Sequence, residues 1–249
     1  MPILPYVADP LFEHPTPAAL YDVLDPDRED LDCYAAMSAE FGAGSVVDIG
    51  CGTGTFALLL AERGLEVTAL DPAAASLDVA RDKPGAHRVR RLHGDATALE
   101  AFHGPGFDLA TMTANVTQAI VDPGAWQATL RAVHGSLRPG GRLVFETRDP
   151  AARAWSGWNR AASRRSTELP GGNTVDSWVE LLDVSPPLVS FRWTFVFRPG
   201  SRVLASDSTV RFRDRTEVEA DLAATGYRVE QVRDAPDRPG SELVFVASR

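Results

Sequence analysis

The sequence predicts an α/β protein built on a doubly wound, mostly parallel sheet of seven strands that ends in an antiparallel hairpin. Three observations predict this fold. Short apolar, β-branched segments alternate with amphipathic segments over residues 43–150. A glycine-rich turn joins the first of these strands to the helix after it. A helix and two further strand segments follow over residues 214–249, behind a stretch that breaks the alternation.

The first four strands follow from a regular order of strand, turn and helix. Strand, glycine turn, helix and strand in this order form a βαβ unit, whose strands are parallel and whose crossover is right-handed. The predicted elements are helices near Ala18–Val23, over Asp30–Phe41, over Thr53–Arg63 and after Asp71-Pro72 through Ala80, and strands at Ser45–Ile49, Leu65–Leu70, Val89–Leu92 and Phe107–Met112.

A helix and a fifth strand complete the parallel part of the sheet. Asp122 is expected to cap this helix, because an aspartate oxygen can accept from free backbone N–H groups of the first turn. Pro123 then occupies the first helical position, where its missing N–H costs nothing. The turn at residues 138–141, Arg-Pro-Gly-Gly, leads into the fifth strand at Arg142–Thr147.

Residues 175–213 break the pattern, since three segments with strand character follow one another without a helix between them. Val189–Phe197 alternates apolar and polar residues, which is typical of an antiparallel strand with one exposed face. The larger segment 151–213 also holds four of the five tryptophans, namely Trp155, Trp158, Trp178 and Trp193. Aromatic side chains often line ligand pockets and interfaces. We therefore expect a β-rich insert that forms a lid over a substrate cleft or a dimer interface.

The last segment of the chain predicts a helix and a hairpin. Thr216 and Glu219 have the spacing of a capping box at the start of a helix that ends at Gly226. Strands are expected at Tyr227–Arg233 and Glu242–Ala247. We divide residues 1–249, a single predicted domain, into four parts. These are an N-terminal cap (1–42), a ligand-binding core (43–150), the insert (151–213) and the terminal helix with its hairpin (214–249).

Composition narrows the classes of partner. The 25 basic and 34 acidic residues give a formal net charge of −9, which disfavours a nucleic-acid substrate. The first six residues lack the basic start and apolar run of a signal peptide, and no stretch approaches the ~20 apolar residues of a membrane helix. We expect a cytoplasmic protein that does not bind membranes. Cys33 and Cys51 fit neither a disulfide framework nor a zinc site, so no metal is expected.

The strongest functional signal is Val46-Val-Asp-Ile-Gly-Cys-Gly-Thr-Gly54, between the first strand and its helix. Glycines there let the backbone turn tightly and approach a ligand closely. A dinucleotide fingerprint needs a third small residue at position 55, which is Thr55, whereas here the third glycine comes one residue earlier. This spacing, with Asp48 two residues before the first glycine, resembles motif I of the class I S-adenosylmethionine (SAM)-dependent methyltransferases, which have a Rossmann-like fold.

The resemblance covers most of the chain and implies a set of cofactor contacts. Asp71, at the end of Val-Thr-Ala-Leu-Asp, resembles the acidic residue that accepts hydrogen bonds from both ribose hydroxyls. Asp95 resembles the residue that holds the adenine amino group, and Asp48 would face the methionine end of SAM. Tyr21-Asp22 is similar to a pair that some small-molecule members fold over the cofactor, although Tyr21 could also be a simple packing residue. The implied SAM-binding residues are Tyr21, Asp48, Gly50, Cys51, Gly52, Asp71, Pro72, Asp95, Ala96 and Met112.

The same resemblance points to a catalytic region after the fourth and fifth strands. Asn115 lies in Met-Thr-Ala-Asn, where the family places catalytic residues, and the segment lacks the Asn/Asp-Pro-Pro-Tyr motif of enzymes that methylate bases. Arg148 and Asp149 follow the fifth strand, and a loop salt bridge is the alternative for both. The sequence thus predicts methyl transfer to an oxygen, nitrogen or carbon atom of a small molecule, in a possible homodimer. A SAM-binding scaffold and an NAD-dependent oxidoreductase are the competing hypotheses.

Overall fold

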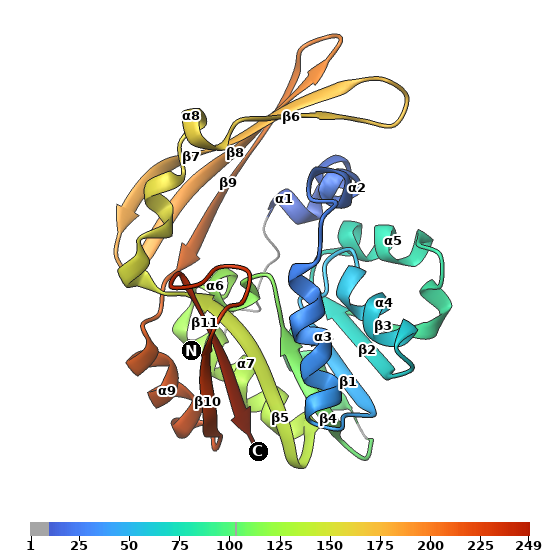
Figure 1. The fold of residues 1–249 in the computed structure, drawn as a ribbon, viewed down its shortest axis with the longest axis vertical. Coiled ribbons are helices and arrows are strands. Elements are labelled where there is room, and N and C mark those ends of the chain that lie inside the picture. The colour runs from blue at the N-terminus through green and yellow to red at the C-terminus, as the bar shows by residue number, and fades with distance from the viewer. Residues whose placement is uncertain (1–9, 103) are drawn as a thin grey trace.

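A mixed sheet of seven strands forms the centre of the fold in the computed structural model, which describes residues 10–102 and 104–249 (Figure 1). The start of the predicted cap, and with it the expected lack of a signal peptide, lies outside the described residues. The core elements are α1 (Pro10–Glu13), α2 (Pro15–Leu24), α3 (Asp30–Glu40), β1 (Ser45–Ile49), α4 (Thr55–Glu62), β2 (Glu66–Asp71), α5 (Ala74–Asp82), β3 (Val89–His93), β4 (Phe107–Met112), α6 (Val116–Ala119), α7 (Pro123–Ser136), β5 (Leu137–Arg148), α9 (Arg215–Ala224), β10 (Arg228–Asp234) and β11 (Glu242–Ser248).

The strand order confirms the predicted doubly wound sheet. It runs β10-β11-β5-β4-β1-β2-β3, with β1 to β5 parallel and β11 antiparallel to both β5 and β10. The chain therefore leaves β1 toward β3 on one side and returns to β4 on the other. Sheets of this kind bind ligands where the order reverses, outside the carboxyl ends of the strands. Here that point lies between β1 and β4.

Apolar side chains are buried on both faces of the sheet, as a doubly wound fold requires. One cluster joins the sheet to α3 and α4, and the other joins it to α7 and α9. Large members of the first cluster are Leu31, Tyr34, Phe56 and Leu60, and large members of the second are Trp126, Leu130, Phe145, Phe245 and Leu222. The core thus fixes the ends of β1, β2, β4 and β5 relative to one another.

The fifth strand begins earlier than its apolar pattern indicated. We predicted Arg142–Thr147, but β5 starts at Leu137 and includes the Arg-Pro-Gly-Gly turn. The reason is pairing with distant segments, since Leu137 pairs with Phe107 of β4 and the glycines of the turn contact the distant end of the chain. The backbone N–H of Gly140 donates to the Arg249 carbonyl at 3.2 Å, and the N–H of Arg249 donates to the Gly141 carbonyl at 2.9 Å. Pairing between residues so far apart leaves no local sequence signal.

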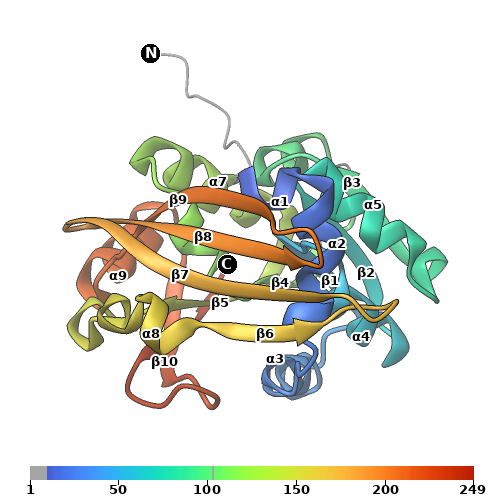
Figure 2. The same cartoon turned by 90° about the horizontal axis from the view of Figure 1, so that it is seen from above.

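The insert forms a second, separate sheet with strand order β6-β7-β8-β9, all antiparallel. Seen from above, it crosses over the carboxyl ends of the core strands (Figure 2). We expected three strands, whereas the described sheet has four, because β6 is a short polar segment without alternation. Its elements are α8 (Arg160–Ser163), β6 (Arg165–Glu168), β7 (Thr174–Ser185), β8 (Leu188–Arg198) and β9 (Arg202–Arg211).

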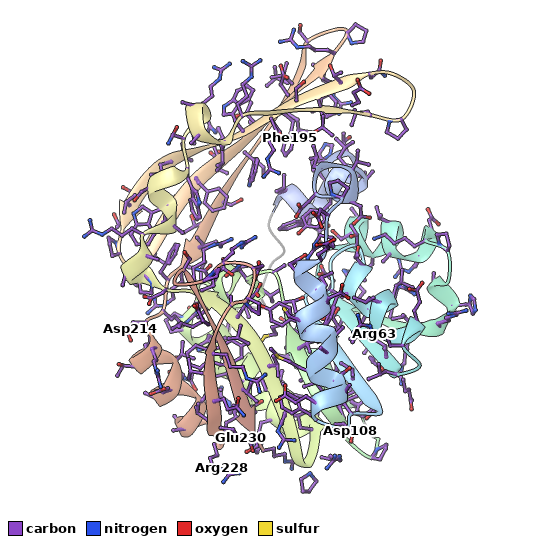
Figure 3. All side chains as sticks on the ribbon, in the orientation of Figure 1. Arg63, Asp108, Phe195, Asp214, Arg228 and Glu230 are labelled. Atoms are coloured by element: carbon purple, nitrogen blue, oxygen red, sulfur yellow. The ribbon has the colours of Figure 1, made fainter. Side chains whose placement is uncertain are left out.

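One face of this second sheet is turned toward the N-terminal helices. The predicted alternation along β8 fits the register, which pairs Trp193 with Ser206 and Phe195 with Leu204. Arg202 lies on the same face as Phe195, and its Nη2 donates to the Thr16 hydroxyl of α2 at 3.4 Å. Phe195 is only 3% exposed and lies beneath the arch of the sheet, near α2 (Figure 3). The aromatic face of the insert therefore points toward the core.

The start of α9 corrects a second prediction. The Asp214 carboxylate accepts from the Glu217 N–H at 2.8 Å and caps the helix (Figure 3). Thr216 and Glu219 do not form the predicted capping box, because Glu219 pairs with Arg215 at 2.7 Å. Asp214→Ala should lower the free energy of unfolding by about 1 kcal/mol, the usual cost of losing a cap. Urea denaturation measures the change, and Thr216→Ala is the control. A larger loss from Thr216→Ala would contradict this assignment.

Candidate active site

A pocket opens at the carboxyl ends of β1, β2 and β4, where the strand order reverses. The glycine-rich loop after β1, the end of β2, the turn after β4 and helices from the N-terminal segment surround it. Its lining residues are Phe12, Tyr21, Arg28, Leu31, Asp48, Gly50, Cys51, Gly52, Thr53, Thr55, Phe56, Asp71, Pro72, Ser76, Thr113, Ala114, Asn115, Val116 and Ala119. Eight of the thirteen predicted site residues are among them.

The glycine loop has the conformation that its sequence predicted. Gly50, Gly52 and Gly54 all have positive φ, at 69°, 53° and 76°, which side chains other than glycine rarely adopt. Gly50 is also needed for space, since a Cβ there would lie 2.5 Å from Cγ2 of Val116. The loop is therefore shaped to run close to both its neighbours and a ligand.

Asp71 holds this loop from the end of β2. Its Oδ2 accepts from the Gly52 N–H at 2.8 Å, and its Oδ1 accepts from the Ala73 N–H at 2.7 Å. The side chain lines the pocket and is mostly buried, and burial raises its pKa above the ordinary value. Each carboxylate oxygen keeps a second lone pair. Asp71 can therefore bind a diol in the pocket while it fixes the loop.

Asp48 is a buried carboxyl group with one free oxygen. Only 1% of the residue is exposed. The Thr111 hydroxyl donates to Oδ1 at 3.0 Å, while Oδ2 has no hydrogen-bond partner among the described residues. Burial raises the pKa of Asp48 to about 7, and the nearby Asp71 carboxylate adds to the rise. An unpaired buried oxygen of this kind is costly, so it points to a partner that the protein itself does not supply.

The cap is tied to the glycine loop by Asp22, which the sequence singled out only as part of the Tyr21-Asp22 pair. Its Oδ1 accepts from the hydroxyls of Thr53 at 2.7 Å and Thr55 at 3.2 Å, and its Oδ2 pairs with Lys83 at 2.6 Å. Tyr21 is next to Asp22 in the chain and lines the pocket. Its ring packs edge-on against Phe12, with the ring centroids 5.9 Å apart. Burial raises the pKa of the Tyr21 phenol. The cap thus closes one side of the pocket.

Arg28 is a pocket residue that sequence reasoning missed. Its guanidinium lies in the pocket lining and forms a two-point pair with Asp30, with both distances 3.0 Å. The side chain is 15% exposed. Arg28 is in the loop before α3 and belongs to no recognisable motif, so only the folded structure brings it to the pocket. It adds a positive charge to a site that otherwise contains two carboxyl groups.

Three predicted cofactor residues lie outside the pocket lining. Asp95 caps a 3₁₀ helix over Ala96–Ala101, and its Oδ1 accepts from the Thr97 N–H at 2.9 Å. Ala96 is 3% exposed and packs in the core, and Met112 is fully buried at the end of β4. The adenine contact of Asp95 stays a prediction, as do the roles of Ala96 and Met112.

The structure brings only one of the three predicted catalytic residues to the pocket. Asn115 lines it from the turn after β4. Arg148 instead pairs with Glu242 at 3.3 Å, and its Nη1 donates to Gln118 at 2.8 Å. Asp149 accepts from the Ala151 N–H at 2.8 Å and caps a short 3₁₀ turn. The salt bridge that was the alternative for Arg148 is therefore present, with Glu242 as its partner.

The side chains of residues 10–102 and 104–249 bear on metal binding, and their helices bear on membrane insertion. No group of three or more His, Cys, Asp or Glu side chains in these ranges is arranged to hold a metal ion. No helix in the same ranges is both long and apolar enough to cross a membrane.

The family model and the two relatives described here are all methyltransferases. Residues 46–141 match the family model described as a methyltransferase domain. The cypemycin N-terminal methyltransferase of a Streptomyces species is 35% identical over 107 residues, 43% of each chain. A ubiquinone biosynthesis O-methyltransferase from Idiomarina loihiensis is 32% identical over 113 residues, 44% of each chain. The matched segment thus spans less than half the length of these relatives.

Solved structures resemble the chain over most of its length. A SAM-dependent methyltransferase from Clostridium acetobutylicum has a TM-score of 0.72 at 18% identity, covering 93% of this chain and 96% of its own. SAM-bound CalS10, an amino pentose methyltransferase from Micromonospora echinaspora, has a TM-score of 0.70 at 24% identity, covering 92% and 96%. At these identities the likeness concerns the fold. The matched family model identifies residues 46–141 as a methyltransferase domain, and the fold that holds the glycine loop, Asp48 and Asp71 is similar to the fold of these solved SAM-dependent methyltransferases.

Proposed function

We propose that this chain transfers the methyl group of SAM to an oxygen, nitrogen or carbon nucleophile of a small molecule. The pocket at the carboxyl ends of β1, β2 and β4 carries the proposal, because it joins the glycine loop, Asp48 and Asp71 in one site. SAM, when bound, supplies an activated methyl group on a sulfonium whose departure leaves a neutral thioether. The protein is then required mainly to orient the reactants and to exclude water.

The residues of the pocket fit this cofactor. The free Oδ2 of Asp48 belongs to a buried carboxyl group, whose ionised form suits a positively charged ligand. Asp71 offers two carboxylate oxygens for the ribose hydroxyls, and Arg28 offers a positive charge for a carboxylate. Tyr21, Cys51 and the loop glycines would line the cofactor, as the sequence predicted.

We assign the acceptor to the side of the pocket that faces α6. Asn115 keeps an unpartnered Oδ1, and Gln118 of α6 keeps an unpartnered Nε2, among the described residues. Both groups are buried, so a bound acceptor that supplies their partners would be oriented by them. Asn115 would contact the acceptor directly. Arg148 would act through Gln118, to which it donates, and the predicted catalytic role of Asp149 would be limited to shaping the loop after β5.

The insert is proposed as the lid of the acceptor site. Ser206 and Ser208 of β9 have buried hydroxyls without a partner in the described chain, and the register pairs them with Trp193 and Phe191. These groups share the face that points toward the core. We expect Trp193→Ala to lower acceptor turnover while SAM affinity stays nearly unchanged. If the face is a dimer interface instead, light scattering would show a changed mass. Normal turnover together with normal mass would contradict both roles of the insert.

A panel of acceptors tests the proposed reaction. Release of S-adenosylhomocysteine should be seen with small molecules bearing hydroxyl, amine or activated carbon groups. Duplex DNA and tRNA should neither be methylated nor bind at physiological salt, because the chain carries a net charge of −9. Tight, salt-sensitive binding of tRNA in an anisotropy assay would contradict the small-molecule assignment.

Two competing hypotheses predict other results. A SAM-binding scaffold would bind SAM but release no S-adenosylhomocysteine with any acceptor. An NAD-dependent oxidoreductase would bind NAD, which the early third glycine at Gly54 disfavours. A cytoplasmic location, a homodimer and the division into cap, core, lid and terminal hairpin stay predictions from the sequence.

A further inference from the structure

The turn after β4 has a backbone conformation that needs external support. Ala114 and Asn115 have φ values of 56° and 60°, so two successive residues other than glycine adopt the left-handed conformation. This conformation costs free energy, more for alanine than for asparagine, and it persists where the surrounding structure holds it. Both residues line the cofactor pocket, as do their neighbours Thr113 and Val116.

Glu146 of β5 forms a hydrogen bond with the central peptide of the turn. Its Oε1 accepts from the backbone N–H of Asn115 at 3.0 Å, and its Oε2 accepts from the Tyr34 hydroxyl of α3. The Glu146 carbonyl also accepts from the Thr117 hydroxyl at 2.9 Å. Glu146 is 5% exposed and is absent from the pocket lining. Glu146 therefore contacts a residue that lines the pocket rather than a ligand inside it.

A second buried carboxylate orients the side chain of the same residue. Nδ2 of Asn115 lies 3.3 Å from both carboxylate oxygens of Glu242 in β11. Glu242 in turn pairs with Arg238 at 2.7 Å and Arg148 at 3.3 Å. Its charge is thus compensated, whereas the Glu146 carboxyl has only the Tyr34 hydroxyl and the Asn115 N–H as partners among the described residues.

The turn after β4 contacts the glycine loop through Val116. Val116 follows Asn115 and packs into the space left by the missing side chain of Gly50, where a Cβ would lie 2.5 Å from its Cγ2. A shift of the turn would therefore move Val116 against Gly50 and change the cofactor side of the pocket. Contacts run from Tyr34 and Glu146 through the Asn115 peptide and Val116 to the loop.

We infer that Glu146 is a positioning residue, which holds the Asn115 turn and through Val116 sets the shape of the cofactor pocket. This inference rests on the proposed binding of SAM at the site. The carbonyl-type oxygen of glutamine can accept from the Asn115 N–H as glutamate does, whereas an apolar side chain cannot. The role therefore predicts rescue by glutamine.

The test compares S-adenosylhomocysteine binding to four folded proteins by isothermal titration calorimetry. Glu146→Leu should weaken binding by about tenfold or more, because it leaves a buried N–H without an acceptor. Glu146→Gln should bind within about threefold of the wild type. Tyr34→Phe is the matched control, since it removes the other hydrogen bond of the same carboxyl group and leaves the Asn115 contact in place. It should also stay within about threefold.

The outcomes separate positioning from general stability. Wild-type affinity of a folded Glu146→Leu protein would overturn the inference, and so would an equal loss in Tyr34→Phe. If Glu146→Leu does not fold, Glu146→Asp decides, because it keeps a buried carboxyl group but withdraws it from Asn115. Binding of Glu146→Asp at the wild-type level would then overturn it. A wild-type protein that binds no S-adenosylhomocysteine would instead contradict the proposed function.

Discussion

Replacing Asp71 by alanine is expected to weaken SAM binding by about 1–3 kcal/mol, or roughly 5- to 150-fold. The side chain has two functions in the structure. It accepts from the backbone N–H groups of Gly52 and Ala73, and it presents its remaining lone pairs to the pocket. The substitution removes the expected partner of the ribose hydroxyls and also frees the glycine loop. Isothermal titration calorimetry with SAM measures the loss directly.

Two control variants show whether the loss is specific. Asp71→Asn keeps an oxygen acceptor and should lose less affinity than Asp71→Ala. Asp122→Ala removes another aspartate that accepts from a backbone N–H, at the start of α7 and outside the pocket lining. It should lower stability without weakening SAM binding. Unchanged SAM affinity in Asp71→Ala would mean that Asp71 is not the ribose ligand.

Replacing Glu146 by glutamine is expected to stabilise the fold at alkaline pH. The pKa of Glu146 is raised from 4.5 to about 7. Burial is the main cause, and the neighbouring Glu242 carboxylate is the second. The folded state therefore holds a proton that the unfolded chain loses near pH 4.5. Glu146 makes its full contribution to the free energy of unfolding at low pH. The fold loses this contribution, on the order of 3 kcal/mol, as the pH rises from 4.5 to about 7.

Urea denaturation at about pH 5 and about pH 8 tests this prediction. The wild type should lose stability between the two values, and Glu146→Gln should lose less because glutamine does not ionise. At the higher pH the variant should therefore be the more stable protein. Asp48, whose pKa is also raised by burial, should give a similar contrast as Asp48→Asn. An equal pH dependence in Glu146→Gln and wild type would contradict the buried, proton-binding state of Glu146.

The fold could be predicted from the sequence wherever local patterns dictate it. Alternating strands and helices, glycine turns and the Asp122 cap each depend on residues close in the chain, and the structure confirms the doubly wound sheet, its seven strands and the cap. The errors have distant causes. The turn at the start of β5 pairs with Arg249, and β6 is a polar strand that is held by pairing with β7 rather than by burial. Asp214 and Thr216 are both good caps, and the sequence does not distinguish them.

The residues of the candidate site also divide into those that the sequence predicted and those that only the structure reveals. The glycine loop, Asp48 and Asp71 occur in motifs whose spacing carries information, and all of them reach the pocket. Arg28 and Glu146 belong to no motif, because their positions depend on how a loop and a strand pack against distant segments. Arg148 could not be assigned from sequence, since its ion pair with Glu242 links residues nearly a hundred positions apart.

The most direct test of the central claim is a calorimetric titration of the wild-type protein with S-adenosylhomocysteine, beside NAD. We expect S-adenosylhomocysteine to bind at a single site and NAD not to bind. At a hundredfold excess over its dissociation constant, the bound ligand should also stabilise the fold by about 2.7 kcal/mol in a parallel denaturation experiment. Binding of NAD without binding of S-adenosylhomocysteine would contradict the assignment of the pocket to SAM.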